Sequence, residues 1–409
     1  MILISRSNQN LKGDLQITGS KSESNRLLLL NQLFQNALKL KNVSNSEDSQ
    51  LMQKALANTS DIIDIHHAGT AMRFLTAYYS TQEGRTITLT GSDRMKQRPI
   101  GVLVDALNRL GANISYLEND GFPPLKIVGK KITTSAITIP ANVSSQYITA
   151  LMLIGTQLEN GLIITLEGKI ISVPYIQMSI QLLNRIGVKA QMNNQEIKVE
   201  YTPTISPKTI DVESDWSSAS YYYSLVALSP NSELSISTYY EDSLQGDSAL
   251  QTIYRENFGV ESSFNNGKLT LKNNPDFVYD EVITLDLNNT PDIAQTIAAT
   301  CVGLGLKCEL TGLETLKIKE TDRLQALKNE LEKVGAEIEI TADSLVIKGY
   351  QSFEETPIFE TYNDHRMAMC MAPLAVKFPI KIENEMVVEK SYPTFWEDWK
   401  ELNFEIKSI

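Results

Sequence analysis

The stretch Arg323–Ile340, RLQALKNELEKVGAEIEI, decides the fold class of this chain of 409 residues. Leu324, Leu327 and Leu331 recur at helical spacing, which places them on one face of a helix. Gly335 follows them, and glycine is the usual residue in the left-handed conformation that ends a helix. The last residues alternate between apolar and charged side chains, as in a strand with one buried face. The stretch therefore predicts a helix, a glycine cap and a half-buried strand.

The same design recurs at three earlier places, and the four glycines lie 76, 72 and 76 residues apart. The three places are Leu103–Gly111–Ala112, Ile180–Gly187–Val188 and Leu250–Gly259–Val260. A nearly fixed period indicates a repeated supersecondary unit, and helical stretches at 24–33 and 367–376 predict further units at both ends. Runs with a period of two fill the gaps as strands: 86–90, 163–167, 197–201, 234–238, 338–341 and 345–348.

The alternating strands predict an α/β fold of the α+β type, with one face of each sheet against helices and the other toward solvent. No glycine-rich dinucleotide fingerprint follows a strand, which excludes a Rossmann domain. The length predicts two or three domains. Polar turns near Thr18–Ser20 and Val212–Asp215 are the best candidates for the boundaries.

Composition restricts the class of partner. A formal net charge of −12 argues against nucleic acids and anionic membranes, because the field of the protein repels polymers of phosphate. The three cysteines form no CxxC pair and indicate the reduced thiols of a cytosolic protein. The N-terminus has no apolar signal-peptide core, and no apolar run approaches the roughly 20 residues of a membrane span. We therefore expect a cytoplasmic protein.

Candidate binding residues gather where helices are predicted to begin. Gly19–Arg26 carries three serines, Lys21 and Arg26 in front of the apolar run Leu27–Leu30. Free backbone N–H groups and the positive end of the helix dipole favour an anion at such a place. The plainer alternative is a serine cap with solvated charges.

A second cluster comes before the predicted helix that ends at Gly111. Arg94, Lys96 and Arg98 crowd its start, and we expect Pro99 at its first position. Cations are disfavoured there by the helix dipole unless an anion compensates them. This conflict between sequence and local rule predicts a bound ligand.

Further helix starts carry hydrogen-bonding or charged groups, each of which alone reads as a normal cap or a solvated face. They are His67–Arg73, in which Thr70 is the expected cap, Ser144–Gln146, Ser172–Tyr175, Asp215–Ser218, Pro291–Ile293, Lys319–Arg323 and Tyr362–Arg366, with Lys390–Pro393 in a late loop. Together they supply more cations than one phosphate needs, with the carboxylates of Asp292 and Glu320 among them. This inventory fits a site for two phosphorylated or carboxylated small molecules with an acid and a base.

These segments resemble, in order, the motifs of the EPSP synthase family. The matches are GSKSxSNR at 19–26, AGTAMR at 68–73, RMKxRPIGxLVDAL at 94–107, SSQ at 144–146, SxPY at 172–175, SSASY at 217–221, PD at 291–292, KETDRL at 319–324 and YNDHRMAM at 362–369. The resemblance implies two similar domains, each of three βαβαββ units around a pseudo-threefold axis, with the active site in the cleft between them. Residues 1–19 with 214–409 would form a discontinuous domain on the phosphoenolpyruvate side, with part of the catalytic groups. Residues 20–213 would form an inserted domain on the shikimate 3-phosphate side.

The resemblance also implies the role of each matching residue. Shikimate 3-phosphate would be bound by Lys21, Ser22, Arg26, Ser144, Ser145, Gln146, Ser172, Asp292 and Lys319. Phosphoenolpyruvate would be bound by Lys21, Gly69, Arg98, Gln146, Arg323, Arg366 and Lys390. Asp292, Glu320 and Lys21 would carry the addition and elimination steps, with the division of proton transfers among them left open. No metal or cofactor is expected, since no His, Cys or acidic cluster has ligand spacing, and the family implies a monomer.

Three departures from the family pattern concern the ligand pockets. His67 and Phe74 flank AGTAMR where the family often has Asn and Pro, and they leave glyphosate sensitivity open. Thr315 stands four residues before Lys319, where Asn is common, and would weaken or reroute one shikimate contact. The alternatives are a UDP-N-acetylglucosamine enolpyruvyl transferase, although Gly91–Pro99 lacks the cysteine usual there, and a non-catalytic ligand-binding relative.

Overall fold

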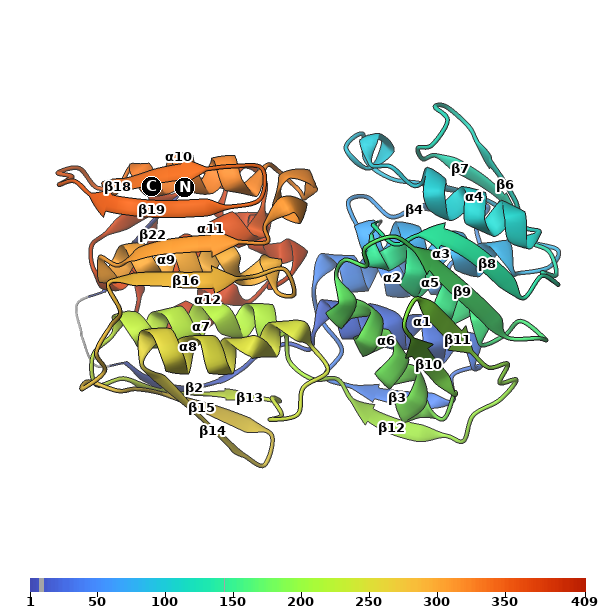
Figure 1. Ribbon diagram of the computed structural model, residues 1–409, viewed down its shortest axis with the longest axis horizontal. Coiled ribbons are helices and arrows are strands. Elements are labelled where there is room, and N and C mark those ends of the chain that lie inside the picture. The colour runs from blue at the N-terminus through green and yellow to red at the C-terminus, as the bar shows by residue number, and fades with distance from the viewer. Residues whose placement is uncertain (7–10, 143) are drawn as a thin grey trace. The chain divides into compact units, whose positions relative to one another are not determined.

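The computed structural model describes residues 1–6, 11–142 and 144–409, and the chain divides into two units (Figure 1). Unit 1 comprises Met1–Thr18 and Glu213–Ile409, and unit 2 comprises Gly19–Val212. The chain thus crosses between units after residues 18 and 212, whereas the expected crossings were after 19 and 213.

Both units are built from one βαβαββ repeat. In unit 2 a complete repeat runs through β4 (Ile62–Asp64), α3 (Gly69–Ser80), β5 (Thr86–Thr90), α4 (Gly101–Leu110), β6 (Asn113–Tyr116) and β7 (Leu125–Val128). β4 and β5 are parallel, and β7 then pairs antiparallel with both β5 and β6, giving the order β4-β5-β7-β6. A crossover helix joins the parallel pair, while a loop joins the antiparallel pair, as strand direction requires.

Two more complete repeats have the same sheet order. In unit 2 the second repeat is β8 (Ala136–Pro140), α5 (Ser145–Gly155), β9 (Leu162–Glu167), α6 (Val173–Ile186), β10 (Ala190–Asn193) and β11 (Glu196–Val199). In unit 1 it is β16 (Val282–Asp286), α9 (Ala294–Leu304), β17 (Lys307–Thr311), α10 (Arg323–Glu332), β18 (Ala336–Ile340) and β19 (Leu345–Tyr350). The periodicity of the glycines therefore reports a real structural repeat.

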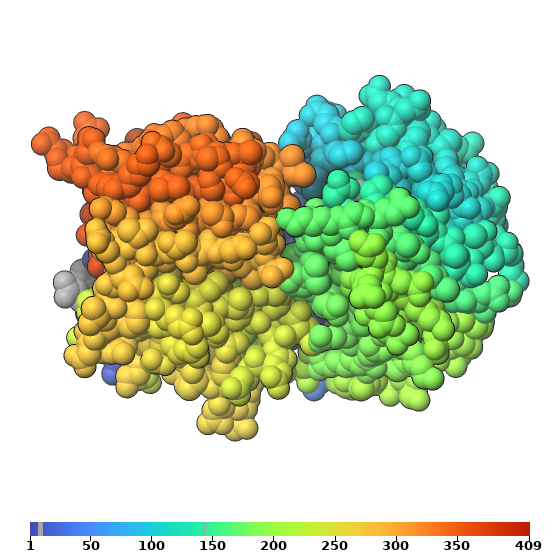
Figure 2. All heavy atoms as spheres, viewed as in Figure 1, coloured from blue at the N-terminus to red at the C-terminus, as the bar shows by residue number. Residues whose placement is uncertain are grey.

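Two repeats are divided between distant parts of the chain at the crossings. In unit 1, β2 (Lys12–Gln16) pairs with β13 (Glu233–Ser237), and the repeat also holds α7 (Trp216–Leu228), α8 (Leu250–Phe258), β14 (Val260–Asn265) and β15 (Lys268–Asn273). The β14–β15 hairpin turns at Asn266 and Gly267, both with positive φ, and projects from the surface in Figure 2. In unit 2, β12 (Lys208–Asp211) pairs with β3 (Leu38–Lys41), next to α1 (Lys21–Leu33) and α2 (Glu47–Ala57). This sheet has two strands, so among the described residues it is the one repeat without a closing hairpin.

The last repeat joins the two ends of the chain. It contains β20 (Ile358–Phe359), α11 (His365–Met371), β21 (Ile380–Ile382), α12 (Phe395–Glu401) and β22 (Glu405–Ser408). Its remaining strand is β1 (Ile2–Ser5), which pairs antiparallel with both β21 and β22. The spatial order β20-β21-β1-β22 is therefore that of the other four-stranded sheets.

The two helices of a repeat differ in burial. In unit 2 the first helices α1, α3 and α5 contact one another, and in unit 1 α9 contacts both α7 and α11. Inner helices such as α3 and α7 are buried nearly all round, whereas second helices such as α4 keep an exposed face. Gly111, Gly187 and Gly259 end second helices as left-handed caps, while Gly335 lies three residues after α10 with φ +82°. No helix among the described residues has the length and apolar character to cross a membrane.

Candidate active site

Four inner helices share one feature at their starts. In α3, α5, α7 and α11 every residue is buried except one, which lies in the first turn. Those four residues are Thr70, Gln146, Ser217 and Arg366. Polar side chains are therefore accessible where the N–H groups of each helix have no intrahelical partner, and where the helix dipole favours anions.

The start of α1 in unit 2 carries Lys21 and Ser22. Ser20 is the N-cap, and its hydroxyl accepts a hydrogen bond from the backbone N–H of Glu23 at 3.4 Å. Lys21 is the first helical residue, and its Nζ lies 3.6 Å from a carboxylate oxygen of Asp48. Ser22 follows it and is half-buried. Sequence reasoning had missed Asp48, because the ion pair joins α1 to α2 and no motif marks it.

Arg26 joins three helices of unit 2 below this surface. Its side chain donates to Ser179 Oγ at 2.8 Å and to the Ser22 carbonyl at 2.7 Å, with longer contacts to Thr149 Oγ1 and the Tyr175 carbonyl at 3.4 Å. Burial lowers the pKa of Arg26 to about 10, opposed by Tyr175 and Glu23. The buried guanidinium places a positive charge beneath the starts of α1, α5 and α6.

Gly69 and Arg98 are brought together at the start of α3. The N-cap is Ala68, whose side chain cannot accept a hydrogen bond, so the expectation that Thr70 caps this helix was wrong. Thr70 Oγ1 instead accepts from Gln146 Nε2 at 3.1 Å, which joins the starts of α3 and α5. A Cβ added to Gly69 would lie 2.6 Å from Arg98 Nη1 and 3.0 Å from its Cζ. The missing side chain of Gly69 thus leaves room for the guanidinium.

The segment that carries Arg98 differs from the expectation. Met95–Gln97 forms a 3₁₀ turn, and α4 begins at Gly101 with Ile100 as N-cap, so the prediction of Pro99 at the first helical position was wrong. The Pro99 carbonyl instead accepts from Arg73 Nη2 at 3.1 Å and from the Tyr147 hydroxyl at 2.6 Å. These contacts fix the residue after Arg98, and the cation lies at the start of α3 rather than α4.

Three serines and a histidine complete the unit 2 surface. Ser144 is the N-cap of α5 and accepts from the backbone N–H of Gln146 at 3.3 Å, and Ser145 next to it is buried. Ser172 precedes α6 with φ +55°, and its hydroxyl makes no cap hydrogen bond. His67 Nδ1 lies 2.7 Å from Ser92 Oγ, so this histidine makes a local hydrogen bond at a helix start.

Arg323 is the centre of the polar cluster in unit 1. It is 2% exposed and contacts three carboxylates: Asp364 at 2.7 Å, Asp292 at 2.9 Å and Glu320 at 2.9 Å. Burial alone would lower the pKa of Arg323, but the carboxylates of Asp364, Glu320 and Asp292 together raise it above its usual value. The arginine therefore stays charged and fixes both carboxylates to which the sequence assigns acid–base roles.

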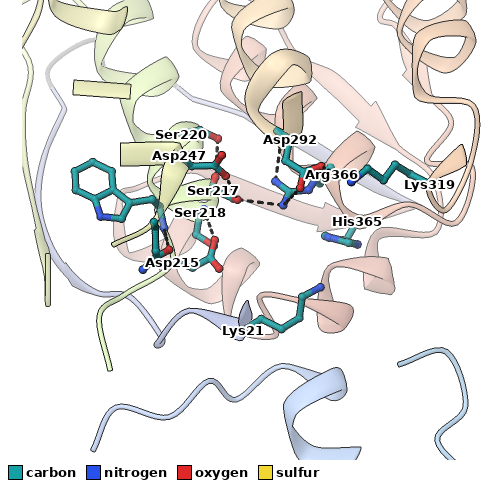
Figure 3. Close-up of polar contacts among 12 residues, drawn as sticks. Lys21, Asp215, Ser217, Ser218, Ser220, Asp247, Asp292, Lys319, His365 and Arg366 are labelled. Atoms are coloured by element: carbon teal, nitrogen blue, oxygen red, sulfur yellow. Dashed lines mark hydrogen bonds and ion pairs between the residues drawn. The ribbon is translucent and has the colours of Figure 1, made fainter. Parts of the chain in front are cut away.

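Asp292 lies among three cations, two of which, Lys319 and Arg366, are labelled in Figure 3. One carboxylate oxygen lies 2.9 Å from Arg323 Nη1 and 3.4 Å from Lys319 Nζ, and the other lies 3.7 Å from Arg366 Nη2. Arg366 Nη1 also donates to the Asp292 backbone carbonyl at 3.0 Å. Three cations therefore surround the carboxylate that the resemblance implies as the general base.

Arg366 makes a further contact that sequence reasoning had missed. Its Nη2 donates to Ser217 Oγ at 3.1 Å, and Ser217 in turn donates to a carboxylate oxygen of Asp247 (Figure 3). Burial and then the charge of Asp292 raise the pKa of Asp247 to about 6. The sequence feature that could have identified Asp247 is its position just before α8, at another helix start.

Lys390 and His365 lie by the turn that leads into α11. Lys390 Nζ donates to the Asn363 carbonyl at 2.7 Å, and Tyr362 and Asn363 both have positive φ. Asp364 caps α11, and its carboxylate accepts from the backbone N–H of Arg366 at 2.9 Å. Buried His365 lies with Nδ1 3.8 Å from that carboxylate. In the described part of the chain, no three His, Cys, Asp or Glu side chains come together as a metal site would require.

Each unit thus gathers serines, cations and helix starts that suit phosphate and carboxylate groups, and unit 1 adds two carboxylates suited to proton transfer. These features define a two-unit α/β protein whose helix N-termini carry groups suited to small anionic molecules. The family model described as EPSP synthase (3-phosphoshikimate 1-carboxyvinyltransferase) matches residues 5–63 and 53–399. The chain belongs to the EPSP synthase family.

Curated relatives and solved structures agree with this assignment. A 3-phosphoshikimate 1-carboxyvinyltransferase of Bacteroides fragilis is 44% identical over 402 residues, which cover 97% of each chain. One from Colwellia psychrerythraea is 34% identical over 417 residues, covering 95% of this chain and 96% of that protein. Two solved structures share the fold: an EPSP synthase of Acinetobacter baumannii (TM-score 0.78, 19% identity, covering 100% of this chain and 99% of that one) and the enolpyruvyl transferase NikO of Streptomyces tendae (0.74, 13%, 99% and 98%).

Proposed function

We propose that this chain transfers the enolpyruvyl group of phosphoenolpyruvate to the 5-hydroxyl of shikimate 3-phosphate and releases phosphate. The observation that carries the proposal is Asp292, held by Lys319, Arg323 and Arg366 next to Glu320. One cluster thereby offers a base, a second carboxylate and cations for a phosphorylated substrate. Membership of the family supports the same reaction.

Shikimate 3-phosphate is assigned mainly to residues of unit 2. Free N–H groups at the starts of α1, α5 and α6 suit its phosphate, and the hydroxyls beside them can donate to its oxygens. Lys21 and the buried charge of Arg26 balance the charge of the phosphate. The proposed contacts are Lys21, Ser22, Arg26, Ser144, Ser145, Gln146 and Ser172, with Asp292 and Lys319 of unit 1 at the ring hydroxyls.

Phosphoenolpyruvate is assigned to cations of both units. Arg98 presents a planar guanidinium at the start of α3, in the space that the missing side chain of Gly69 leaves open. Arg366 and Lys390 lie at the start of α11, and Arg323 fixes the carboxylates behind them. Lys21 and Gln146 complete the proposed set.

The proposed chemistry is addition followed by elimination. Asp292 accepts the proton of the 5-hydroxyl as its oxygen bonds to C2 of phosphoenolpyruvate, and a proton is added to C3. The C–O bond to phosphate then breaks and C3 loses a proton, which restores the double bond. Glu320 is assigned the proton transfers at C3, with Lys21 stabilising the phosphate that leaves. Because Arg323 binds both carboxylates, their protonation is coupled.

The proposal includes three further expectations. Neither a metal nor an organic cofactor takes part, since acid–base groups and cations suffice for each step. The protein acts as a monomer in the cytoplasm. Dialysis against a chelator should leave activity unchanged, and size-exclusion chromatography should give a mass near 45.7 kDa; loss of activity or a dimer would correct these expectations.

The test is release of phosphate from phosphoenolpyruvate by the purified protein. Release that depends on shikimate 3-phosphate and gives the enolpyruvyl ether would support the proposal. The same assay with UDP-N-acetylglucosamine as acceptor tests the alternative of a UDP-N-acetylglucosamine enolpyruvyl transferase, which the family match does not favour. Binding of both substrates without release would indicate the non-catalytic relative.

A further inference from the structure

Asp247 is a buried carboxylate with no role in the chemistry proposed above. It lies in the short 3₁₀ turn Gly246–Ala249 of unit 1, before α8, and is 6% exposed. Its carboxylate accepts a hydrogen bond from Ser217 Oγ at the start of α7. Ser217 Oγ accepts in turn from Arg366 Nη2 at 3.1 Å (Figure 3). Three helix starts are thereby joined in one line of polar contacts.

The direction of these hydrogen bonds depends on the charge of Asp247. A serine hydroxyl has one hydrogen, and an ionised carboxylate can only accept, so the hydrogen of Ser217 points to Asp247. The lone pairs of Ser217 are then free to accept from Arg366. A protonated or amidated side chain at position 247 could donate to Ser217 instead, which would release the serine hydrogen to turn toward Arg366 and so weaken the hydrogen bond from Nη2.

Arg366 has an alternative partner close by. Its Nη1 is held by the Asp292 carbonyl at 3.0 Å, while its Nη2 lies 3.7 Å from the Asp292 carboxylate. The hydrogen bond to Ser217 accompanies this longer ion-pair distance between Nη2 and the carboxylate. Without it, a small rotation of the guanidinium would pair Nη2 with Asp292, the proposed base.

The groups that face Asp247 come from three other segments. They are Ser217 and Asp215 of α7 and its cap, Asp292 before α9, and Arg366 of α11. Burial is the largest influence that raises the pKa of Asp247, followed by Asp292, while Arg366 and Ser217 lower it; the result is about 6. The carboxylate therefore changes charge in a pH range where the enzyme can be assayed.

We propose that Asp247 is a positioning residue for enolpyruvyl transfer: acting through Ser217, it holds the guanidinium of Arg366 toward an anionic substrate and keeps its Nη2 at ion-pair distance, rather than hydrogen-bond distance, from the carboxylate of Asp292. The inference rests on the proposed function for its kinetic consequences. Its structural consequence is whether Arg366 Nη2 donates to Ser217 Oγ or to the Asp292 carboxylate, and this can be observed without turnover.

The kinetic test compares Asp247→Asn with the wild type. The amide keeps the size of the side chain and removes the obligatory acceptor. We expect the KM for phosphoenolpyruvate to rise or kcat to fall, so that kcat/KM drops about tenfold to hundredfold, the range for one hydrogen bond to a charged group. Asp276→Asn, an exposed change of the same charge in unit 1, should leave kcat/KM unchanged. Equal kinetics for wild type and Asp247→Asn would overturn the proposal.

A double-mutant cycle tests whether Asp247 acts through Ser217. Ser217→Ala should cause a loss similar to that of Asp247→Asn, and the double variant should be little worse than either single variant. Losses that multiply would mean that the two residues act independently, which refutes the relay.

The pH dependence separates positioning from a structural role. The ratio of wild-type to Asp247→Asn kcat/KM cancels the titration of the substrate itself. We expect a constant high ratio above about pH 7 that falls toward one below about pH 6, where the wild-type carboxyl becomes protonated. A ratio that stays constant across this range would contradict the proposal.

Crystal structures of both proteins give a readout that requires no activity. In Asp247→Asn we expect Arg366 Nη2 to leave Ser217 and to come within hydrogen-bond distance of the Asp292 carboxylate. An unchanged Arg366 would overturn the inference. Wild-type protein without phosphate release would instead count against the proposed function alone.

Discussion

Gly69→Ala is the substitution that tests the assigned phosphoenolpyruvate site most directly. A Cβ at this position would lie 2.6 Å from Arg98 Nη1, 3.0 Å from its Cζ and 3.1 Å from its Nη2. Ordinary contacts begin near 3.4 Å, so the guanidinium must retreat by about 0.8 Å. The end of an arginine side chain is flexible, and the helix backbone is not, so Arg98 is the group that moves.

The displacement sets the size of the effect. A misplacement of about 1 Å in a group that orients a substrate can cost about a hundredfold in rate. We therefore expect kcat/KM for phosphoenolpyruvate to fall between tenfold and a hundredfold. The KM for shikimate 3-phosphate should change by less than about threefold, because Ser22 and Arg26 are untouched. The fold should not be weakened, since alanine favours a helix over glycine by about 1 kcal/mol.

Steady-state kinetics with each substrate varied in turn measure this effect. Gly101→Ala is the matched control, because Gly101 is the first residue of neighbouring α4, and its nearest neighbour for a Cβ is the Cα of Gly121 at 3.3 Å rather than Arg98. An unchanged KM and kcat for phosphoenolpyruvate in Gly69→Ala, with a crystal structure in which Arg98 has moved, would refute the assignment of Arg98 to this substrate.

Three other changes test separate parts of the proposal. Asp292→Asn should lower kcat by about 10²- to 10⁴-fold, the usual contribution of a general base, and should leave substrate binding intact because three cations remain; a kcat within tenfold of wild type would exclude the role. Asp247 has a pKa raised from 3.8 to about 6, so it stabilises the fold below about pH 4 and loses that contribution as the pH rises through 6. Urea unfolding should therefore show that the free energy of unfolding of Asp247→Asn, relative to that of the wild type, rises by about 3 kcal/mol from pH 4 to pH 7. A difference in this free energy that stays constant with pH would contradict the raised pKa of Asp247. Thr315 Oγ1 is buried and has no hydrogen-bond partner among the described residues, so Thr315→Asn, with a longer reach, should lower the KM for shikimate 3-phosphate about twofold to tenfold, and a higher KM would mean that the pocket has no room for the amide.

Local patterns carried most of the information about the fold. The glycines at 111, 187 and 259 predicted helix ends because only the chain near each glycine decides whether the left-handed conformation is needed. The same holds for Asp364 before Arg366, where cap and helix are neighbours in sequence. Amphipathic second helices could be predicted in this way, since one face stays exposed.

Features that depend on distant segments could not be predicted from local patterns. Arg98 lies at the start of α3, 29 residues earlier in the chain, because Arg73 and Tyr147 hold the Pro99 carbonyl. Asp247 follows no motif, and its contact with Ser217 arises only when two helix starts meet. The sequence also did not predict that the sheet of β3 and β12 has no closing hairpin among the described residues, because an absent element leaves no pattern in the sequence.

The pairing of β1 has a consequence for the order in which the protein folds during synthesis. β1 leaves the ribosome before every other strand described, yet its partners β21 and β22 end at residues 382 and 408. Unit 2 is continuous from Gly19 to Val212, so all of its strands can pair before most of unit 1 has been made. β1 must therefore wait unpaired until β21 and β22 have been made, and until then a nascent chain should hold a folded unit 2 while unit 1 is still incomplete.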